Sequence, residues 1–196
     1  FRRDLRLEDN VGLYQALQSG YPVLPLFIFD DAILEHLPKD DARVTFIYES
    51  LSKINEKLAE FGSSLLVKKG KTQDVWQQLI TEFEVKVLFF NKDYEPYAIN
   101  RDQHITELLA QNGVKVQAFK DQVIFEEAEI TKADGLPYTV YTPYKNKWLE
   151  KYKTIAPVTE HETTVFSENW LASSFVFPSL SAIGFETSSI KVKPHN

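Results

Sequence analysis

FRRDLRLEDNVGL, residues 1–13, is the segment that best indicates the fold of the chain. Six charged residues stand between positions 2 and 9, and the residues that follow become helix-like. This pattern is typical of the turn that leaves a buried strand and enters the first helix of an α/β domain. We therefore expect a strand directly before the turn, truncated at Phe1 or lying wholly before it.

Strands and helices alternate from this turn to Phe119. Helices, with apolar residues on one face, are predicted over Asn10–Ser19, Asp41–Phe61, Thr72–Phe83 and Pro96–Gln111. Strands are predicted over Tyr21–Phe29, Leu65–Val67, Val85–Phe90 and Val114–Phe119. The first of these is apolar throughout, which favours a parallel sheet buried on both faces. With the strand before Phe1, the sequence predicts a Rossmann-like α/β fold with a doubly wound, five-stranded parallel sheet.

The alternation of strands and helices ends at Phe119. We expect a short strand extension over Val123–Phe125 and a helix over Tyr144–Tyr152. Thr142-Pro143 is expected to interrupt the regular structure before that helix. Residues 154–196 are rich in Ser, Thr and Pro and weakly patterned, which is typical of a connector. We therefore predict an α/β domain over residues 1–153 and a C-terminal interdomain connector over 154–196.

Composition restricts the classes of function. There are no cysteines and only four scattered histidines, so neither disulfides nor a structural metal site is expected. The longest apolar run, Val23–Phe29, is too short to cross a bilayer, and we expect a cytoplasmic protein without a membrane partner. A net charge of −6 argues against a broad basic face for nucleic acid in this chain.

Ligands of open parallel sheets bind beyond the carboxyl ends of the strands. The candidate ligand-binding residues in those loops are Asp30, Arg43, Asp93, Glu95 and Tyr97. The expected apolar walls are Phe29, Ile33, Leu34 and Phe46. An arginine among carboxylates with apolar walls suits a flat heteroaromatic ligand with polar edges. The alternative is that these charged residues are helix caps and solvated ion pairs.

Sequence patterns for other chemistries are incomplete. Gly70-Lys71-Thr72 matches the end of a phosphate-binding loop, but Leu65 stands where that loop needs a glycine. The chain has no Gly-x-Gly-x-x-Gly fingerprint and no serine in a nucleophile elbow. No catalytic residue is predicted.

Four segments resemble the DNA photolyase and cryptochrome family. They are FRRDLRLEDNVGL at residues 1–13, NKDYEPYA at 91–98, LPYTVYTPYKNKWL at 136–149 and FPSLSAIGF at 177–185. The resemblance implies the N-terminal antenna domain of a photolyase that repairs cyclobutane pyrimidine dimers with light. It further implies that FAD and the lesion pocket lie in a separate C-terminal helical domain, and that the partners are this domain and UV-damaged DNA.

The same resemblance implies an antenna chromophore in this domain. Asp93, Glu95 and Tyr97 are similar to residues of deazaflavin-binding members, and Arg43 is similar to their chromophore-contacting arginine. Folate-binding members carry Asn-Glu where this chain has Tyr97 and Ala98. A deazaflavin or FMN is therefore favoured over a methenyl folate.

Two alternatives remain at this point. A cryptochrome has the same architecture and signals instead of repairing DNA, and these segments do not separate it from a photolyase. A stand-alone nucleotide-binding module, such as an adenine-nucleotide-binding stress protein, has the same sheet topology. The lack of a glycine-rich phosphate loop and the long segment after Phe119 count against that module.

Overall fold

The structure of the chain, a computed structural model, describes residues 1–190, with the side chains of residues 127, 165 and 167 left aside. The last part of the predicted connector, residues 191–196, lies outside the described residues. The elements are α1 (Val11–Leu17), β1 (Leu26–Asp30), α2 (Asp31–Leu34), α3 (Ala42–Ala59), β2 (Leu66–Gly70), α4 (Thr72–Glu82), β3 (Val87–Asn91), α5 (Pro96–Gln111), β4 (Lys115–Phe119), the 3₁₀ helix η1 (Glu127–Glu129), α6 (Tyr141–Tyr152) and the 3₁₀ helix η2 (Thr163–Asn169).

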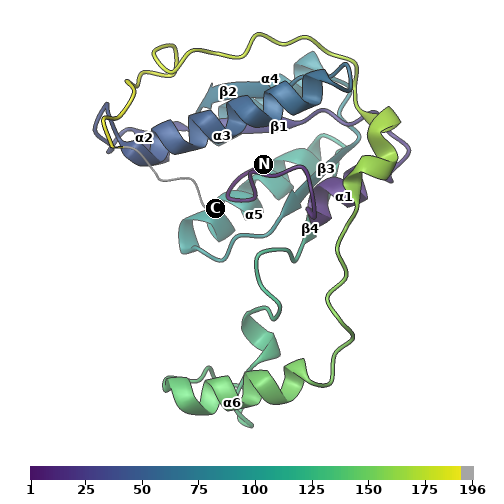
Figure 1. Cartoon of the computed structure of the whole chain (residues 1–196), viewed down its shortest axis with the longest axis vertical. Coiled ribbons are helices and arrows are strands. Elements are labelled where there is room, and N and C mark those ends of the chain that lie inside the picture. The colour runs from purple at the N-terminus through teal and green to yellow at the C-terminus, as the bar shows by residue number, and fades with distance from the viewer. Residues whose placement is uncertain (191–196) are drawn as a thin grey trace.

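The strands form two parallel pairs. β1 pairs with β2 from Leu26 opposite Leu66 to Asp30 opposite Gly70. β3 pairs with β4 from Val87 opposite Lys115 to Asn91 opposite Phe119. The predicted parallel α/β arrangement is thus present (Figure 1), whereas the described residues hold four strands in two sheets. A single five-stranded sheet stays a prediction.

Helices cover both faces of the strands, and each face has its own core. Phe27 and Phe29 of β1 pack with α1 and α3 in one core. Leu26 and Ile28, the alternate residues of the same strand, pack with α4 and α5 in the other. Successive side chains of a strand point to opposite faces, so a strand covered on both sides needs apolar residues throughout. This explains the unbroken apolar run that marked the strand in the sequence.

Local capping sets where the helices begin. Asn10 accepts a hydrogen bond from the Leu13 amide at 3.0 Å and begins α1. Asp41 accepts one from the Arg43 amide at 2.8 Å and begins α3. Such caps satisfy backbone donors that have no partner within the helix. β1 begins later than predicted, because Pro25 has no amide hydrogen to add to a ladder and only an isolated bridge at Val23 precedes it.

α6 stands apart from the α/β body, and extended segments lead to it and away from it (Figure 1). The helix begins at Tyr141, three residues earlier than predicted. The predicted break at Thr142-Pro143 is wrong, because Pro143 lies in the first turn of the helix, where a proline is tolerated. The predicted strand extension over Val123–Phe125 is absent from the described residues. Phe125 instead packs edge-on against Trp148 of α6, with ring centroids 5.3 Å apart.

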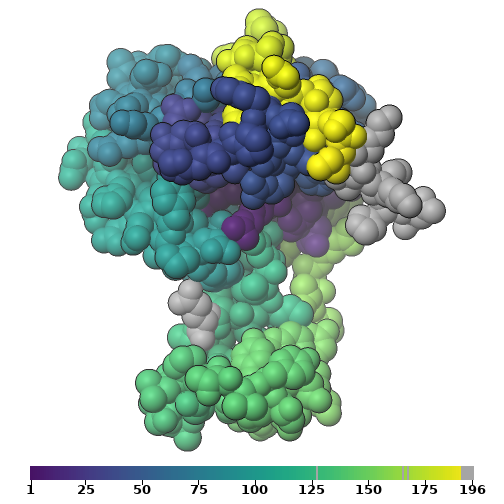
Figure 2. Space-filling view, turned by 90° about the vertical axis from the view of Figure 1, so that its left-hand side faces the viewer, coloured from purple at the N-terminus to yellow at the C-terminus, as the bar shows by residue number. Residues whose placement is uncertain are grey.

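The predicted connector returns to the α/β body. After η2, residues Trp170, Leu180, Ile183 and Phe185 are buried in the same core as α1 and α3. The last described residues before 191 lie over α2 and α3, seen as yellow against dark blue in Figure 2. This segment therefore contributes several core residues, although its sequence has no clear hydrophobic periodicity that would predict them.

Two features are absent from the described residues. No helix among residues 1–190 is long and apolar enough to cross a membrane. No group of three or more His, Cys, Asp or Glu side chains in this part of the chain is arranged to hold a metal ion.

Candidate functional site

Asp30 is the centre of a polar cluster at the carboxyl end of β1. Its Oδ2 accepts hydrogen bonds from the Tyr97 hydroxyl at 2.6 Å and from the Thr72 hydroxyl at 2.8 Å. The Arg101 guanidinium lies 3.9 Å from the same oxygen. Asp30 also caps α2 through the Ala32 amide. The first turns of α4 and α5, which follow β2 and β3, thus converge on one buried carboxylate at the end of β1.

Tyr97 forms the half-exposed edge of this cluster. Burial and the hydrogen bond to Asp30 raise the pKa of its hydroxyl to about 12, so it stays a hydrogen-bond donor across the physiological range. The Arg101 guanidinium lies 5.7 Å from the centre of its ring. Tyr97 therefore presents an aromatic surface held by a fixed hydroxyl, beside a cation.

Asp93 and Glu95 bind Arg3 of the opening turn instead of joining the Asp30 cluster. Arg3 Nε lies 3.3 Å from Asp93 Oδ2, and its Nη2 lies 3.5 Å from Glu95 Oε1. The two carboxylates therefore do not face the solvent as unbalanced negative charge. Arg3 had no predicted role in the sequence.

Arg43 lies at the start of α3, where its guanidinium pairs with Asp41 at 2.7 Å. Its side chain is 72% exposed. Two large apolar side chains on α2 and α3, Ile33 and Phe46, are about half exposed, whereas Phe29 and Leu34 belong to the buried core. Only two of the four expected apolar walls are therefore open to a ligand.

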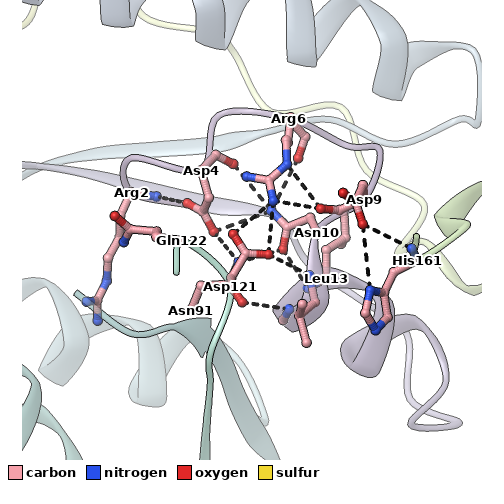
Figure 3. Close-up of polar contacts among 12 residues, drawn as sticks. Arg2, Asp4, Arg6, Asp9, Asn10, Leu13, Asn91, Asp121, Gln122 and His161 are labelled. Carbon is pink, nitrogen blue, oxygen red and sulfur yellow. Dashed lines mark hydrogen bonds and ion pairs between the residues drawn. The ribbon is translucent and has the colours of Figure 1, made fainter. Parts of the chain in front are cut away.

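A second polar cluster holds the opening turn against the end of β3 (Figure 3). Asn91 Nδ2 donates to Asp4 Oδ2 at 2.7 Å and to Asn10 Oδ1 at 2.9 Å. Asn91 Oδ1 accepts the Gly12 amide at 2.7 Å. A Cβ atom at position 12 would lie 2.8 Å from that oxygen, so only glycine lets α1 approach β3 this closely.

The charges of the opening turn are also paired. Arg6 binds the buried Asp121 carboxylate at 2.9 Å, and Asp121 accepts the Val11 amide at 3.0 Å. Asp9 accepts the His161 amide at 3.0 Å, which joins the turn to the segment after α6 (Figure 3). Burial raises the pKa of Asp4, but the N-terminal ammonium and hydrogen bonds from Arg2 and Asn91 outweigh it and leave this pKa below the usual value. The charged residues of the opening turn therefore hold the turn in place through ion pairs and hydrogen bonds, and their arrangement does not resemble that of a catalytic site.

A cavity of about 550 Å³ lies between β1 and β3. Thr72 and Arg101 line it, together with apolar residues of the strands and of α1, α4 and α5. None of the five predicted ligand-binding residues is among the described residues that line this cavity. The predicted site is instead a shallow surface at the carboxyl edge.

The structure thus divides the predicted residues into three groups. Asp30 meets Tyr97, Asp93 and Glu95 share Arg3, and Arg43 pairs with Asp41. Thr72, Arg101 and Arg3 were missed. One signal was available for Arg101, because it follows Tyr97 by four residues and so lies on the same face of α5.

These groups can bind a ligand but have no nucleophile with an adjacent base. The guanidinium groups supply donors to a polar edge, whereas the Tyr97 and Thr72 hydroxyls donate their hydrogens to Asp30 and offer only acceptor oxygens. Tyr97, Ile33 and Phe46 supply exposed apolar surface. The arrangement fits a planar aromatic molecule that lies on the surface and is held at its polar rim.

Comparison with known proteins identifies relatives along most of the chain. The family model for DNA photolyase matches residues 1–163. A deoxyribodipyrimidine photo-lyase of Synechococcus sp. is 30% identical over 190 residues, covering 94% of this chain and 39% of that protein. The chain therefore spans well under half the length of this relative. Cryptochromes are among the similar proteins as well.

Solved structures agree with this comparison. A bacterial class III photolyase from Agrobacterium tumefaciens has a TM-score of 0.74 at 27% identity, over 92% of this chain and 36% of that one. An archaeal photolyase from Sulfolobus tokodaii, described with two FAD molecules and a novel light-harvesting cofactor, has a TM-score of 0.68 at 29% identity, over 83% of this chain and 35% of that one.

Proposed function

The chain belongs to the DNA photolyase family, and on this premise we propose that it is the N-terminal domain of a deoxyribodipyrimidine photo-lyase. The full protein would repair cyclobutane pyrimidine dimers with light, using reduced FAD in a C-terminal helical domain. One fact supports this proposal: the similarity to the Synechococcus photo-lyase covers 94% of this chain and 39% of that protein.

In this proposal residues 1–153 are the antenna domain and 154–196 the connector to the helical domain. The partners are that helical domain and, through the whole protein, UV-damaged DNA in the cytoplasm. A net charge of −6 supports a positive DNA-binding groove elsewhere than in this chain. The sheet would be doubly wound and five-stranded, with one further strand between β1 and β3.

We further propose that the carboxyl edge of the sheet holds an antenna chromophore, bordered by Asp30, Arg43, Asp93, Glu95 and Tyr97. When bound, this chromophore would absorb light and pass excitation to FAD. The observation that carries the proposal is the 2.6 Å hydrogen bond from Tyr97 to Asp30, which brings the loops after β1 and β3 together. Ion pairs of Asp93 and Glu95 with Arg3 also lower the repulsion of an anionic ligand phosphate.

A flavin-type chromophore is favoured over a methenyl folate. Tyr97 and Ala98 occupy the positions of the folate-type pair, and Tyr97 with Phe46 offers aromatic surface to a planar ring system. FMN and a deazaflavin both suit these residues. FAD is a further candidate chromophore, because the Sulfolobus photolyase is described with two FAD molecules and a novel light-harvesting cofactor.

Chromophore retention tests the antenna role. The chain is incubated with FMN, FAD, a deazaflavin or a methenyl folate and desalted, and its near-ultraviolet and visible spectrum is recorded. We expect a flavin or deazaflavin to be retained. Arg43→Ala and Tyr97→Phe should weaken retention by about tenfold each, the loss of one hydrogen-bonding or ionic contact.

Lys53→Ala is the matched control, because Lys53 is an exposed cation on the same helix as Arg43. It should retain the chromophore like the native chain. Retention of none of the four compounds by the native chain would refute the antenna role and leave this domain as a platform for the helical domain.

A cryptochrome is the second candidate, since cryptochromes share the similarity. Light-dependent repair of dimer-containing DNA by the whole protein separates the two functions. We expect repair by the whole protein and none by residues 1–196 alone.

A further inference from the structure

A second cavity lies at the other end of the strands from Asp30 and Tyr97. It has a volume of about 460 Å³ and opens on the α1 side of β3 and β4. α1 has only seven residues, and it meets β3 near the carboxyl end, where Gly12 binds Asn91. The amino halves of both strands therefore lie under a hollow on this side. A ligand there would not compete with a chromophore at the carboxyl edge.

The floor of this second cavity is apolar. Val87 and Phe89, alternate residues of β3, line it and are only partly buried. The Phe89 ring is stacked on the Phe119 ring of β4, with centroids 6.4 Å apart and planes 6° from parallel. This stacking restricts the orientation of Phe89. The floor therefore offers an oriented aromatic side chain to a flat ring.

Four polar side chains border this floor on two sides. Gln15 and Gln18 come from α1, where their spacing of three residues places them on one side of the helix. Lys115 and Gln117 come from β4. Within residues 1–190, these four side chains form no hydrogen bond or ion pair with another described residue. Their donors and acceptors are therefore available to a ligand.

The charge of this cavity is positive, in contrast to the net charge of −6 of the whole chain. Lys86 and Lys115 line it, and none of the described residues that line it is acidic. Lys86 forms an ion pair with Glu84, which lies outside the lining. The Lys115 amide donates to the Lys86 carbonyl oxygen at 3.0 Å, so both lysines stand at one end of the cavity. An anionic group of a ligand is therefore expected at this end.

These groups match the parts of a mononucleotide. A carboxamide both donates and accepts hydrogen bonds, so a glutamine can bind the mixed donor and acceptor edge of a base. The ammonium group of a lysine binds phosphate as a point charge. The volume lies within the range of small-molecule sites, roughly 300–1,000 Å³. The net charge of −6 disfavours a longer polyanion, so a ligand with a single phosphate fits better.

We propose that this cavity binds a nucleoside monophosphate. We call it the α1–β4 pocket, and its lining includes Gln15, Gln18, Val87, Phe89, Lys115 and Gln117. The base lies on the apolar floor between the glutamines, and the phosphate lies at Lys115. The pocket shares none of the five residues proposed to border the chromophore. Either proposal can therefore fail without the other.

Titration with mononucleotides tests the α1–β4 pocket. AMP, GMP, CMP and UMP are each titrated into the chain in a calorimeter at low salt, and the amide signals of Gly113 and Gln117 are followed by NMR. We expect at least one nucleotide to bind with a Kd below about 1 mM and to shift these two signals. Lys115→Gln should weaken its binding about tenfold. Added NaCl should weaken binding to the native chain more than to this variant.

Two further variants locate the ligand. Lys53→Gln removes an exposed cation on α3 and should bind the nucleotide like the native chain. Gln117→Trp places a large ring at the exposed edge of the pocket and should abolish binding, and its midpoint of urea unfolding checks that the fold is kept. The matching nucleoside and inorganic phosphate should each bind at least about tenfold more weakly than the nucleotide.

Absence of binding by all four nucleotides at about 1 mM would overturn the proposal. So would binding that survives both Lys115→Gln and Gln117→Trp, or that shifts the amide signals of Tyr97 and Ala98 instead, because the ligand would then lie elsewhere. Tighter binding of a short single-stranded DNA than of any mononucleotide would also overturn it, because the pocket would then be part of a nucleic-acid site.

Discussion

Asp4, Asn10 and Asn91 place polar groups where a small α/β domain usually has apolar ones. All three are buried, and they bind one another. Among the described residues, no buried side-chain nitrogen or oxygen lacks a hydrogen-bond partner. A satisfied polar network of this kind orients a turn more narrowly than apolar contact does, because each bond has a preferred direction.

Asn91 is the residue on which this network depends most. Asn91→Ala would leave Asp4, Asn10 and the Gly12 amide each short of a partner, and we expect it to lower the free energy of unfolding by about 2–4 kcal/mol. Asn112→Ala, at an exposed helix end, is the control and should cost less than about 1 kcal/mol. Urea unfolding measures both. Equal losses would mean that the network contributes little.

Asp41 gives the stability a pH dependence in acid. Hydrogen bonds from the Arg43 side chain lower the pKa of Asp41 from the usual 3.8 to about 2. Because the pKa is lower in the folded state, this stabilisation is complete above about pH 4 and is lost as the pH falls toward 2.

Asp41→Asn removes this charge while keeping a capping oxygen. At neutral pH it should lower the free energy of unfolding by at most about 1 kcal/mol, because Arg43 is exposed. The difference from the native chain should narrow as the pH falls from about 4. Asp40→Asn, an exposed neighbour, is the control. Urea unfolding between about pH 6 and pH 3 tests this, and a difference independent of pH would contradict it.

Among the α-helices of the described residues, α6 differs from the others in having no buried residue. Trp148 stacks on Tyr152 with ring centroids 5.0 Å apart and meets Phe125 edge-on. Leu136, Val140 and Tyr141 nearby are exposed. Such a surface suits packing against another domain.

Two tryptophans test how far α6 is independent of the α/β body. Trp148→Ala should loosen α6, measured as faster amide exchange in residues 141–152, and change the global free energy of unfolding by less than about 1 kcal/mol. Trp76→Ala, in the core on α4, should cost about 3–5 kcal/mol. A global loss of similar size for both would show that α6 is part of the cooperative unit.

At the scale of the whole molecule, the chain after α6 closes the fold. The His161 amide donates to Asp9 of the opening turn. The Ser173 hydroxyl accepts a hydrogen bond from the Ser64 amide, beside β2, and forms another with the Ser64 hydroxyl. Ile183 and Phe185 enter the core of α1 and α3. The segment after α6 is therefore a strap across the α/β body, so removing it should destabilise the body.

Ile183 and Ile190 form a matched pair within this strap. Ile183→Ala should lower the free energy of unfolding by about 2–4 kcal/mol, because its side chain is 2% exposed. Ile190, 68% exposed, should lose less than about 0.5 kcal/mol on the same change. Denaturant unfolding compares them, and a neutral Ile183→Ala would show that the strap packs too loosely to stabilise the core.

Local pattern sufficed for the elements and for part of the site. Helix periodicity, caps and apolar runs predicted parallel strands alternating with helices, since these features depend on neighbours in the sequence. The same order placed Asp30 and Tyr97 in loops that meet. The segment 1–13 was correctly interpreted as a turn entering α1.

The remaining features depend on contacts between residues far apart in the sequence. Arg3 is paired with Asp93 across 90 residues of chain, and Ile183 became a core residue in a segment without periodicity. The cavity between β1 and β3 exists because strands distant in sequence share a layer. Contacts of this kind depend on which surfaces meet after folding, and residue spacing along the chain carries no record of them.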